Sequence, residues 1–92
     1  MHSGAKTLTA QEIEQWLAEK IGTRLDVDAG SVDVNAFFDD FGLDSTEALV
    51  LAGELEGWIG MRLQTTALWY HPTIAELAAY IAEELGAHVG AS

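Results

Sequence analysis

The spacing of apolar residues predicts amphipathic helices, and three of them begin with the same polar signal. Thr9, Asp44 and Thr73 can each accept a hydrogen bond from a free N–H at a helix start, and a glutamate follows each of them three positions later. Apolar residues then recur every three or four positions, which is the spacing of one helix face. The first stripe is Ile13, Trp16, Leu17, Ile21 and Leu25, and the last is Ile74, Leu77, Ala78, Ile81 and Leu85. We expect the last helix to run to about Leu85 and to stop at Gly86.

The segments between these helices complete the expected architecture. Residues 26–43 form a long connection, which Phe37, Phe38 and Phe41 are expected to fix to the core. A short helical turn is predicted within residues 65–70. The predicted fold class is therefore all-α: a small four-helix bundle with one short helix and a long loop between the first and second helices.

Length and composition indicate one domain. The two ends lack any helical pattern, so residues 1–7 and 87–92 are expected to be flexible tails around a domain at 8–86. The chain has no cysteine, which excludes disulfides, thiolate metal sites and a cysteine nucleophile. No apolar run approaches the roughly 18 residues of a membrane span. The absence of cysteine is compatible with the cytosol, and we expect a cytoplasmic, monomeric domain.

The charge is strongly negative. The sequence has 15 acidic and 4 basic residues, and its net charge is −11. This charge opposes binding to nucleic acid or to an anionic membrane, and it favours a protein partner with a basic surface. Between Arg24 and Arg62 the chain contains no lysine, arginine or histidine, so this whole span is uniformly acidic. Its acidic residues are Asp26, Asp28, Asp33, Asp39, Asp40, Asp44, Glu47, Glu54 and Glu56.

Ser45 lies inside this acidic span, in the stretch FGLDSTEALV, and its surroundings argue against catalysis. A catalytic serine needs a neighbouring base, and the G-x-S-x-G pattern is absent. Of the three histidines, His2 and His88 lie in the tails, and His71 is better suited to a capping or packing role. A serine at this place could also simply satisfy free backbone N–H groups.

A calcium loop is also a poor match. An EF-hand needs oxygen ligands at positions 1, 3 and 5, glycine at 6 and glutamate at 12. Counting from Asp26 places Gly30 at position 5 and Phe37 at position 12. Counting from Asp33 places Phe37 at position 5 and Phe38 at position 6. We therefore predict no metal site.

The segment FGLDSTEALVLAGELE resembles the modification site of acyl carrier proteins, and TTALWYHPTIAELAAYIAEEL resembles the third and fourth helices of polyketide-synthase carrier domains. The resemblance implies that Ser45, preceded by Leu43 and Asp44, accepts a 4'-phosphopantetheine arm. A phosphopantetheinyl transferase with coenzyme A and magnesium would attach the arm, so the domain itself needs no catalytic group. The arm would carry acyl groups as thioesters, and its phosphodiester would lie at a helix N-terminus, which favours anions.

A finer resemblance concerns the cargo. AGELEGWIG followed by LWYHPTIAELA is similar to carrier domains that fatty-acyl-AMP ligases load, which implies a fatty acyl cargo and a ketosynthase or other polyketide-synthase domains as further partners. Two alternatives stay open. The chain could be an acidic helical interaction module that is never modified, or a peptidyl carrier of a non-ribosomal peptide synthetase.

The second helix has two contrasting sides at 100° per residue. Its core side is predicted to contain Ala48, Leu51, Ala52, Leu55, Trp58 and Ile59. The opposite side carries the small or uncharged residues Thr46, Val50, Gly53 and Gly57, bordered by Glu47 and Glu54. We expect this docking strip to let a partner approach while the acids steer it. Trp16, Trp58 and Trp69 are expected to pack in the core or at its rim.

Overall fold

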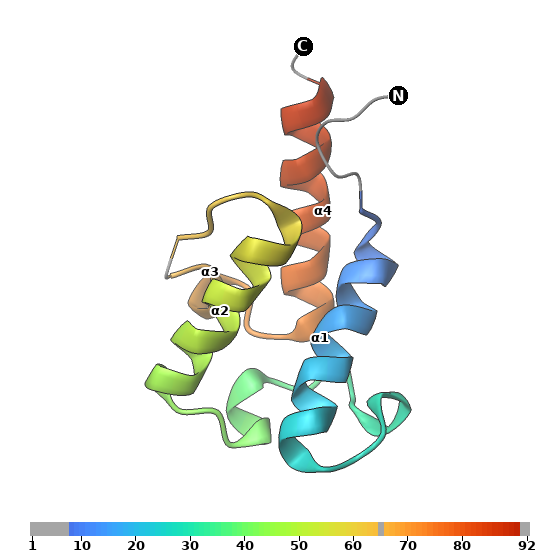
Figure 1. Ribbon diagram of the computed structural model, residues 1–92, viewed down its shortest axis with the longest axis vertical. Coiled ribbons are helices and arrows are strands. Elements are labelled where there is room, and N and C mark those ends of the chain that lie inside the picture. The colour runs from blue at the N-terminus through green and yellow to red at the C-terminus, as the bar shows by residue number, and fades with distance from the viewer. Residues whose placement is uncertain (1–7, 65, 91–92) are drawn as a thin grey trace.

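The computed structural model describes residues 8–64 and 66–90, with side chains described as far as residue 86, and this part of the chain is a bundle of α-helices (Figure 1). The helices are α1 (Ala10–Leu25), α2 (Ser45–Ile59), the short α3 (Ala67–Tyr70) and α4 (Ile74–Gly90). Two 3-10 turns, η1 (Ala29–Ser31) and η2 (Phe38–Phe41), lie within the long connection between α1 and α2. The predicted fold class is confirmed.

The three predicted helix starts form as expected. The Glu12 amide donates to Oγ1 of Thr9 (3.1 Å), and the Glu76 amide donates to Oγ1 of Thr73 (3.1 Å). The Glu47 amide donates to Asp44 at the start of α2 (2.8 Å). Each such cap is worth about 1 kcal/mol. The three polar signals in the sequence therefore coincide with the helix starts in the structure.

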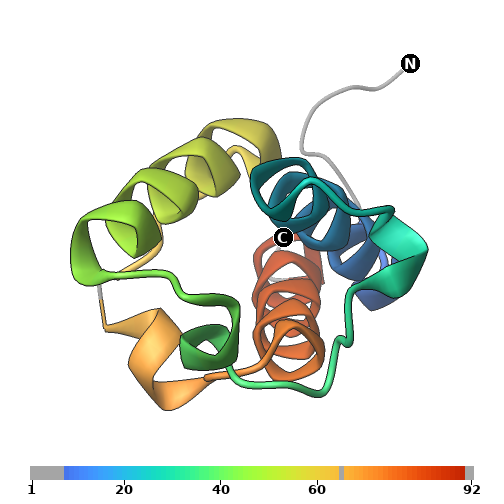
Figure 2. The same ribbon diagram turned by 90° about the horizontal axis from the view of Figure 1, so that it is seen from below.

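The core is built from one side of each long helix. Figures 1 and 2 show α1 and α4 side by side, and Figure 2 shows α2 flanked by α1 on one side and by α3 on the other. The most completely buried side chains are Ile13, Leu17, Ile21, Leu55, Ile59, Ile74, Leu77 and Ile81. Most of them belong to the predicted stripes, so apolar spacing located the core correctly. Leu25 is the exception among the stripe residues, because it lies partly exposed in the last turn of α1.

Two predictions about individual positions are wrong. α4 continues through Gly86 to Gly90. A glycine inside a helix costs only about 1 kcal/mol relative to alanine and removes no hydrogen bond, so it need not end the helix. Phe37 does not fix the loop to the core, since it is 56% exposed. Its backbone pairs with Thr73 in an isolated β-bridge, and the next residue, Phe38, is the one that is buried.

The flexible tails stay predictions, although α4 includes residues 87–90 of the predicted C-terminal tail. Residues 1–7 and 91–92 lie outside the described residues, as does Thr65. No helix within the described part of the chain is both long enough and apolar enough to cross a membrane.

Candidate functional site

Ser45 occupies the first position of α2, where a closed capping box fixes the backbone. Asp44 precedes the helix in an extended conformation, and its Oδ1 accepts from the Glu47 amide (2.8 Å). In return, the Asp44 amide donates to Oε1 of Glu47 (3.3 Å). Ser45 lies between these two residues and is exposed. Among the described residues, no group forms a hydrogen bond to its hydroxyl, which is therefore available to an approaching enzyme.

The loop before Ser45 is tied to the bundle. The Phe38 amide donates to the carbonyl oxygen of Pro72 (2.9 Å), and the Phe38 side chain is buried. Gly42 ends η2 with a φ of 75°, a left-handed conformation that costs glycine little. Leu43 then packs against the core immediately before the capping residue. These contacts set the position at which the chain enters α2.

Ser45 opens onto a pocket between α2 and α3. The volume of this pocket is about 190 Å³. Its lining residues are Ser45, Ala48, Leu49, Ala52, Leu68 and Trp69. Apart from the serine hydroxyl, its lining side chains are apolar. The hydroxyl of Ser45 thus lies at a helix start, with an apolar surface beside it.

Leu49 and Trp69 were not expected in this place. Leu49 is 52% exposed and Trp69 is 62% exposed, although both are large and apolar. Trp69 therefore lies outside the core. The other two tryptophans do pack as predicted, since Trp16 and Trp58 are stacked with their ring centroids 5.0 Å apart. A sequence signal for Leu49 existed, because it follows Ser45 by four positions and so shares its side of the helix. The position of Trp69 depends on how α3 folds against α2.

The predicted docking strip lies on a different side of α2 from Ser45. Thr46, Val50, Gly53 and Gly57 are all exposed, and a Cβ added at either glycine would meet open space. At 100° per residue, the centre of this strip is rotated by roughly 110° from Ser45. The strip begins at Thr46, next to the serine, but faces about a third of a turn away from it. A partner that covers both must therefore wrap around the start of the helix. The role of the strip stays a prediction.

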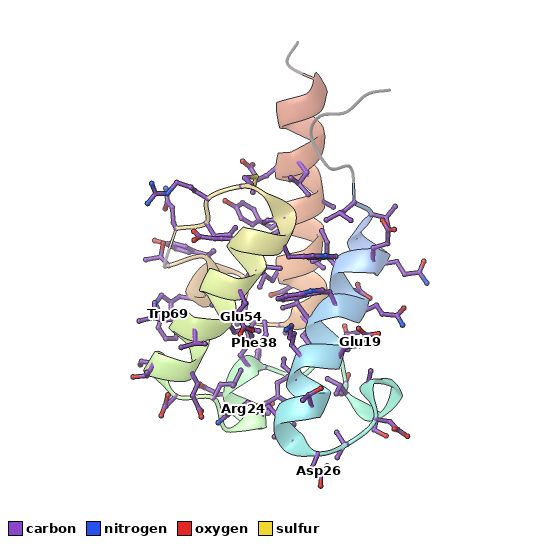
Figure 3. The ribbon with its side chains drawn as sticks, in the orientation of Figure 1. Glu19, Arg24, Asp26, Phe38, Glu54 and Trp69 are labelled. Carbon is purple, nitrogen blue, oxygen red and sulfur yellow. The ribbon has the colours of Figure 1, made fainter. Side chains whose placement is uncertain are left out.

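The acids at the border of the strip are paired with α1. Arg24 forms an ion pair with Glu47, and Lys20 lies 3.8 Å from Glu54. These side chains rim a groove of about 250 Å³ between α1 and α2, whose apolar floor includes Ile21 and Leu51. In Figure 3, Arg24 lies between α1 and the start of α2, and Trp69 lies on the other side of α2. Glu47 and Glu54 are therefore less available for steering a partner than the sequence indicated.

The acids of the long connection remain on the surface. Within the described residues, none of them takes part in an ion pair, so the loop that leads to Ser45 keeps its negative charge. They are Asp26, Asp28, Asp33, Asp39 and Asp40. The described residues contain no group of three acidic or histidine side chains that could hold a metal ion. His71 stacks on Tyr80 with ring centroids 4.3 Å apart, as its predicted packing role requires.

Comparisons with known proteins agree with this geometry. Residues 15–81 match the family described as the phosphopantetheine attachment site. The chain is 34% identical over 84 residues to one component of the phenolphthiocerol/phthiocerol polyketide synthase of Mycobacterium tuberculosis, in an alignment that covers 91% of this chain and 4% of that protein. The chain thus spans only a small part of that relative.

Two solved structures are also similar. One is an acyl carrier protein from Anabaena sp. PCC 7120 with a variant phosphopantetheinylation-site sequence: its TM-score is 0.80 and its identity 36%, with 91% of this chain and 99% of that chain covered. The other is a free-standing peptidyl carrier protein from Acinetobacter baumannii: its TM-score is 0.76 and its identity 31%, with 84% and 96% covered. The chain therefore belongs to the phosphopantetheine-attachment family of non-catalytic carrier domains, to which a phosphopantetheinyl transferase covalently attaches 4'-phosphopantetheine.

Proposed function

We propose that Ser45 is the attachment point and that the domain carries acyl groups for a polyketide-type assembly line. The observation that carries this proposal is an exposed hydroxyl, free of hydrogen bonds to described residues, at the first position of a capped helix. It lies within the segment that matches the family. The first turn of a helix has free N–H groups and a positive dipole end, which favour the phosphodiester formed there.

The attachment step needs little from the chain itself. Oγ of Ser45 attacks the phosphorus of coenzyme A that bears the pantetheine, the bond to the bridging pyrophosphate oxygen breaks, and 3',5'-ADP leaves. The serine proton passes to a base on the transferase. The carrier supplies only a fixed and accessible nucleophile, which is what the capping box of α2 and the exposed serine provide. The arm supplies a thiol that holds an acyl group as a thioester, and the chain has no cysteine of its own.

Intact-mass measurement tests the attachment. The apo-protein is incubated with coenzyme A, Mg²⁺ and a phosphopantetheinyl transferase of broad specificity. We expect a gain of one phosphopantetheine mass, no gain in Ser45→Ala, and an unchanged gain in Ser31→Ala, which removes another exposed serine of the acidic span. If wild type gains no mass, or Ser45→Ala still gains it, the chain acts as an unmodified interaction module or is modified elsewhere.

Acyl cargo is favoured over peptidyl cargo because the relatives include a polyketide synthase and an acyl carrier protein. A peptidyl carrier is also similar in structure, so the two functions need a direct comparison. The holo-protein is offered to a fatty-acyl-AMP ligase and, separately, to an amino-acid adenylation domain. We expect a fatty acyl mass on the arm with the ligase. An aminoacyl mass alone would favour the peptidyl function.

The docking strip is proposed as the surface that the loading enzyme covers. Its support is the row of exposed uncharged residues beside Ser45, with open space over Gly53. Gly53→Arg places a long cationic side chain in the strip and should slow loading. Gly30→Arg is the matched control, because Gly30 also has open space but lies beside the outer face of α1. Equal loading of both variants would exclude the strip from the interface.

A further inference from the structure

The carboxylate of Glu47 holds together three parts of the chain. Its Oε1 accepts from the Asp44 amide (3.3 Å), and its Oε2 is paired with Nη2 of Arg24. The Glu47 amide donates to Oδ1 of Asp44 (2.8 Å). One side chain thus closes the capping box of α2 and ties that box to the last turn of α1. In the sequence, Ser45 lies between Asp44 and Glu47, the two residues of the capping box.

The first turn of a helix is its least secure part. The N–H groups of this turn lack partners within the helix, and helix ends open locally more readily than the core does. The reciprocal bond of the box is long at 3.3 Å, and the glutamate side chain that makes it has several rotatable bonds. A second contact that restrains the carboxylate would therefore keep the box closed for a larger fraction of the time.

Arg24 is placed to provide this restraint. It comes three residues after Ile21, which is 1% exposed and belongs to the core. Figure 3 shows Arg24 between α1 and the beginning of α2. The pair joins residues 23 positions apart in sequence. The other polar or aromatic contacts between α1 and α2, Lys20 with Glu54 and Trp16 with Trp58, lie further along α2, so Arg24 makes the contact at its first turn.

We propose that Arg24 is a positioning residue for Ser45. It holds the Glu47 carboxylate in the closed capping box and thereby fixes the backbone that presents the serine hydroxyl to the transferase; this last step rests on the proposed function. The same contact occupies Glu47, so that Glu47 serves the geometry of the site and contributes less to attracting partners.

The competing explanation is an ordinary surface ion pair. The side chains of Arg24 and Glu47 are 41% and 32% exposed, and exposed pairs often contribute little to global stability. The two explanations differ in their local effects. A positioning role requires that loss of Arg24 should loosen the first turn of α2, even where the unfolding transition of the whole domain hardly changes.

The chain offers a matched control in Lys20. This residue lies four positions before Arg24 on α1 and pairs with Glu54, two helical turns beyond Glu47. Arg24→Met and Lys20→Met remove the same charge from the same helix. Only the first breaks the link to the capping box. A change in transfer kinetics that comes from net charge should therefore appear in both variants. A change that comes from the positioning of Ser45 should appear only in Arg24→Met.

Hydrogen exchange and transfer kinetics together test the proposal. In the apo-protein, amide exchange at Glu47 and Ala48 should be about two- to five-fold faster in Arg24→Met than in wild type, and unchanged in Lys20→Met. With the transferase, kcat should fall by a similar factor in Arg24→Met while KM moves equally in both variants. Arg24→Lys should recover part of the loss. In a Glu47→Gln background, Arg24→Met should have no further effect.

Each result has a defined consequence. Unchanged exchange in Arg24→Met, equal effects of the two α1 substitutions, or faster exchange without a change in kcat would overturn the positioning role. Exchange is measured without the arm, so its outcome does not depend on the proposed function. If neither wild type nor any variant gains an arm, the proposed function fails. The exchange result still reports on the contact between Arg24 and Glu47.

Discussion

Gly22 lies where the chain leaving α1 turns back against the helix, so substituting alanine tests how the long connection begins. Gly22 is buried, and the Val27 amide donates to its carbonyl oxygen (2.9 Å). A Cβ at this position would lie 2.8 Å from the carbonyl oxygen of Val27 and 3.3 Å from the amide nitrogen of Ala29. Both are backbone atoms, which cannot rotate away as the end of a flexible side chain could.

The magnitude follows from one stabilising term and two destabilising terms. Alanine is favoured over glycine inside a helix by about 1 kcal/mol. Overpacking costs about 1–3 kcal/mol, and displacing the returning chain weakens a hydrogen bond worth about 1 kcal/mol. We therefore expect Gly22→Ala to lower the free energy of unfolding by about 1–3 kcal/mol. With a urea m-value of about 1 kcal/mol/M for a small domain, the midpoint should fall by roughly 1–3 M.

Gly53→Ala is the matched control on α2. No neighbouring atom lies within 4 Å of an added Cβ there, so only the propensity term operates and stability should rise by up to about 1 kcal/mol. Urea unfolding followed by circular dichroism compares the two variants with wild type. If Gly22→Ala is as stable as wild type or more stable, the close approach between α1 and the returning chain is not a constraint on this fold.

Three other substitutions test the loop, the cap and the pocket. Phe38→Ala should cost about 3–5 kcal/mol because that ring is buried, whereas Phe37→Ala should change stability by less than about 0.5 kcal/mol. Equal losses of stability in urea unfolding would contradict the conclusion that only Phe38 is buried. Asp44→Ala should cost about 1 kcal/mol and lower the rate of arm attachment, and an unchanged rate would show that the cap does not hold Ser45. Trp69→Ala should leave stability within about 0.5 kcal/mol of wild type, because its ring is mostly exposed, but should alter the fluorescence change that accompanies arm attachment; an identical change would place the arm away from α3.

The helices and the core could be predicted because their causes are local. Thr9 and Asp44 cap helices through residues three positions away, and the stripe from Ile74 to Leu85 is buried as its spacing indicates. Ser45 could be selected because its motif, its place at a helix start and the missing catalytic neighbours can all be read along a single stretch of sequence.

The remaining features depend on contacts between distant segments. Phe37 and Phe38 are equally apolar, and the sequence does not indicate that Phe37 pairs with Thr73 in a β-bridge while the Phe38 side chain is buried. Trp69 borders the pocket of Ser45 because α3 folds against α2. The sequence alone gives no partner for Glu47 or Glu54, and their partners on α1 become visible only when the two helices are placed side by side.

Locating the arm on the chain tests the central claim most directly. Trypsin cleaves after Arg24 and Arg62, so the relevant peptide spans residues 25–62 and contains two serines, Ser31 and Ser45. Fragment-ion mass spectrometry of this peptide from the modified protein can distinguish them. We predict that every fragment carrying the phosphopantetheine mass includes Ser45. An arm on Ser31, or on any other peptide, would contradict the account.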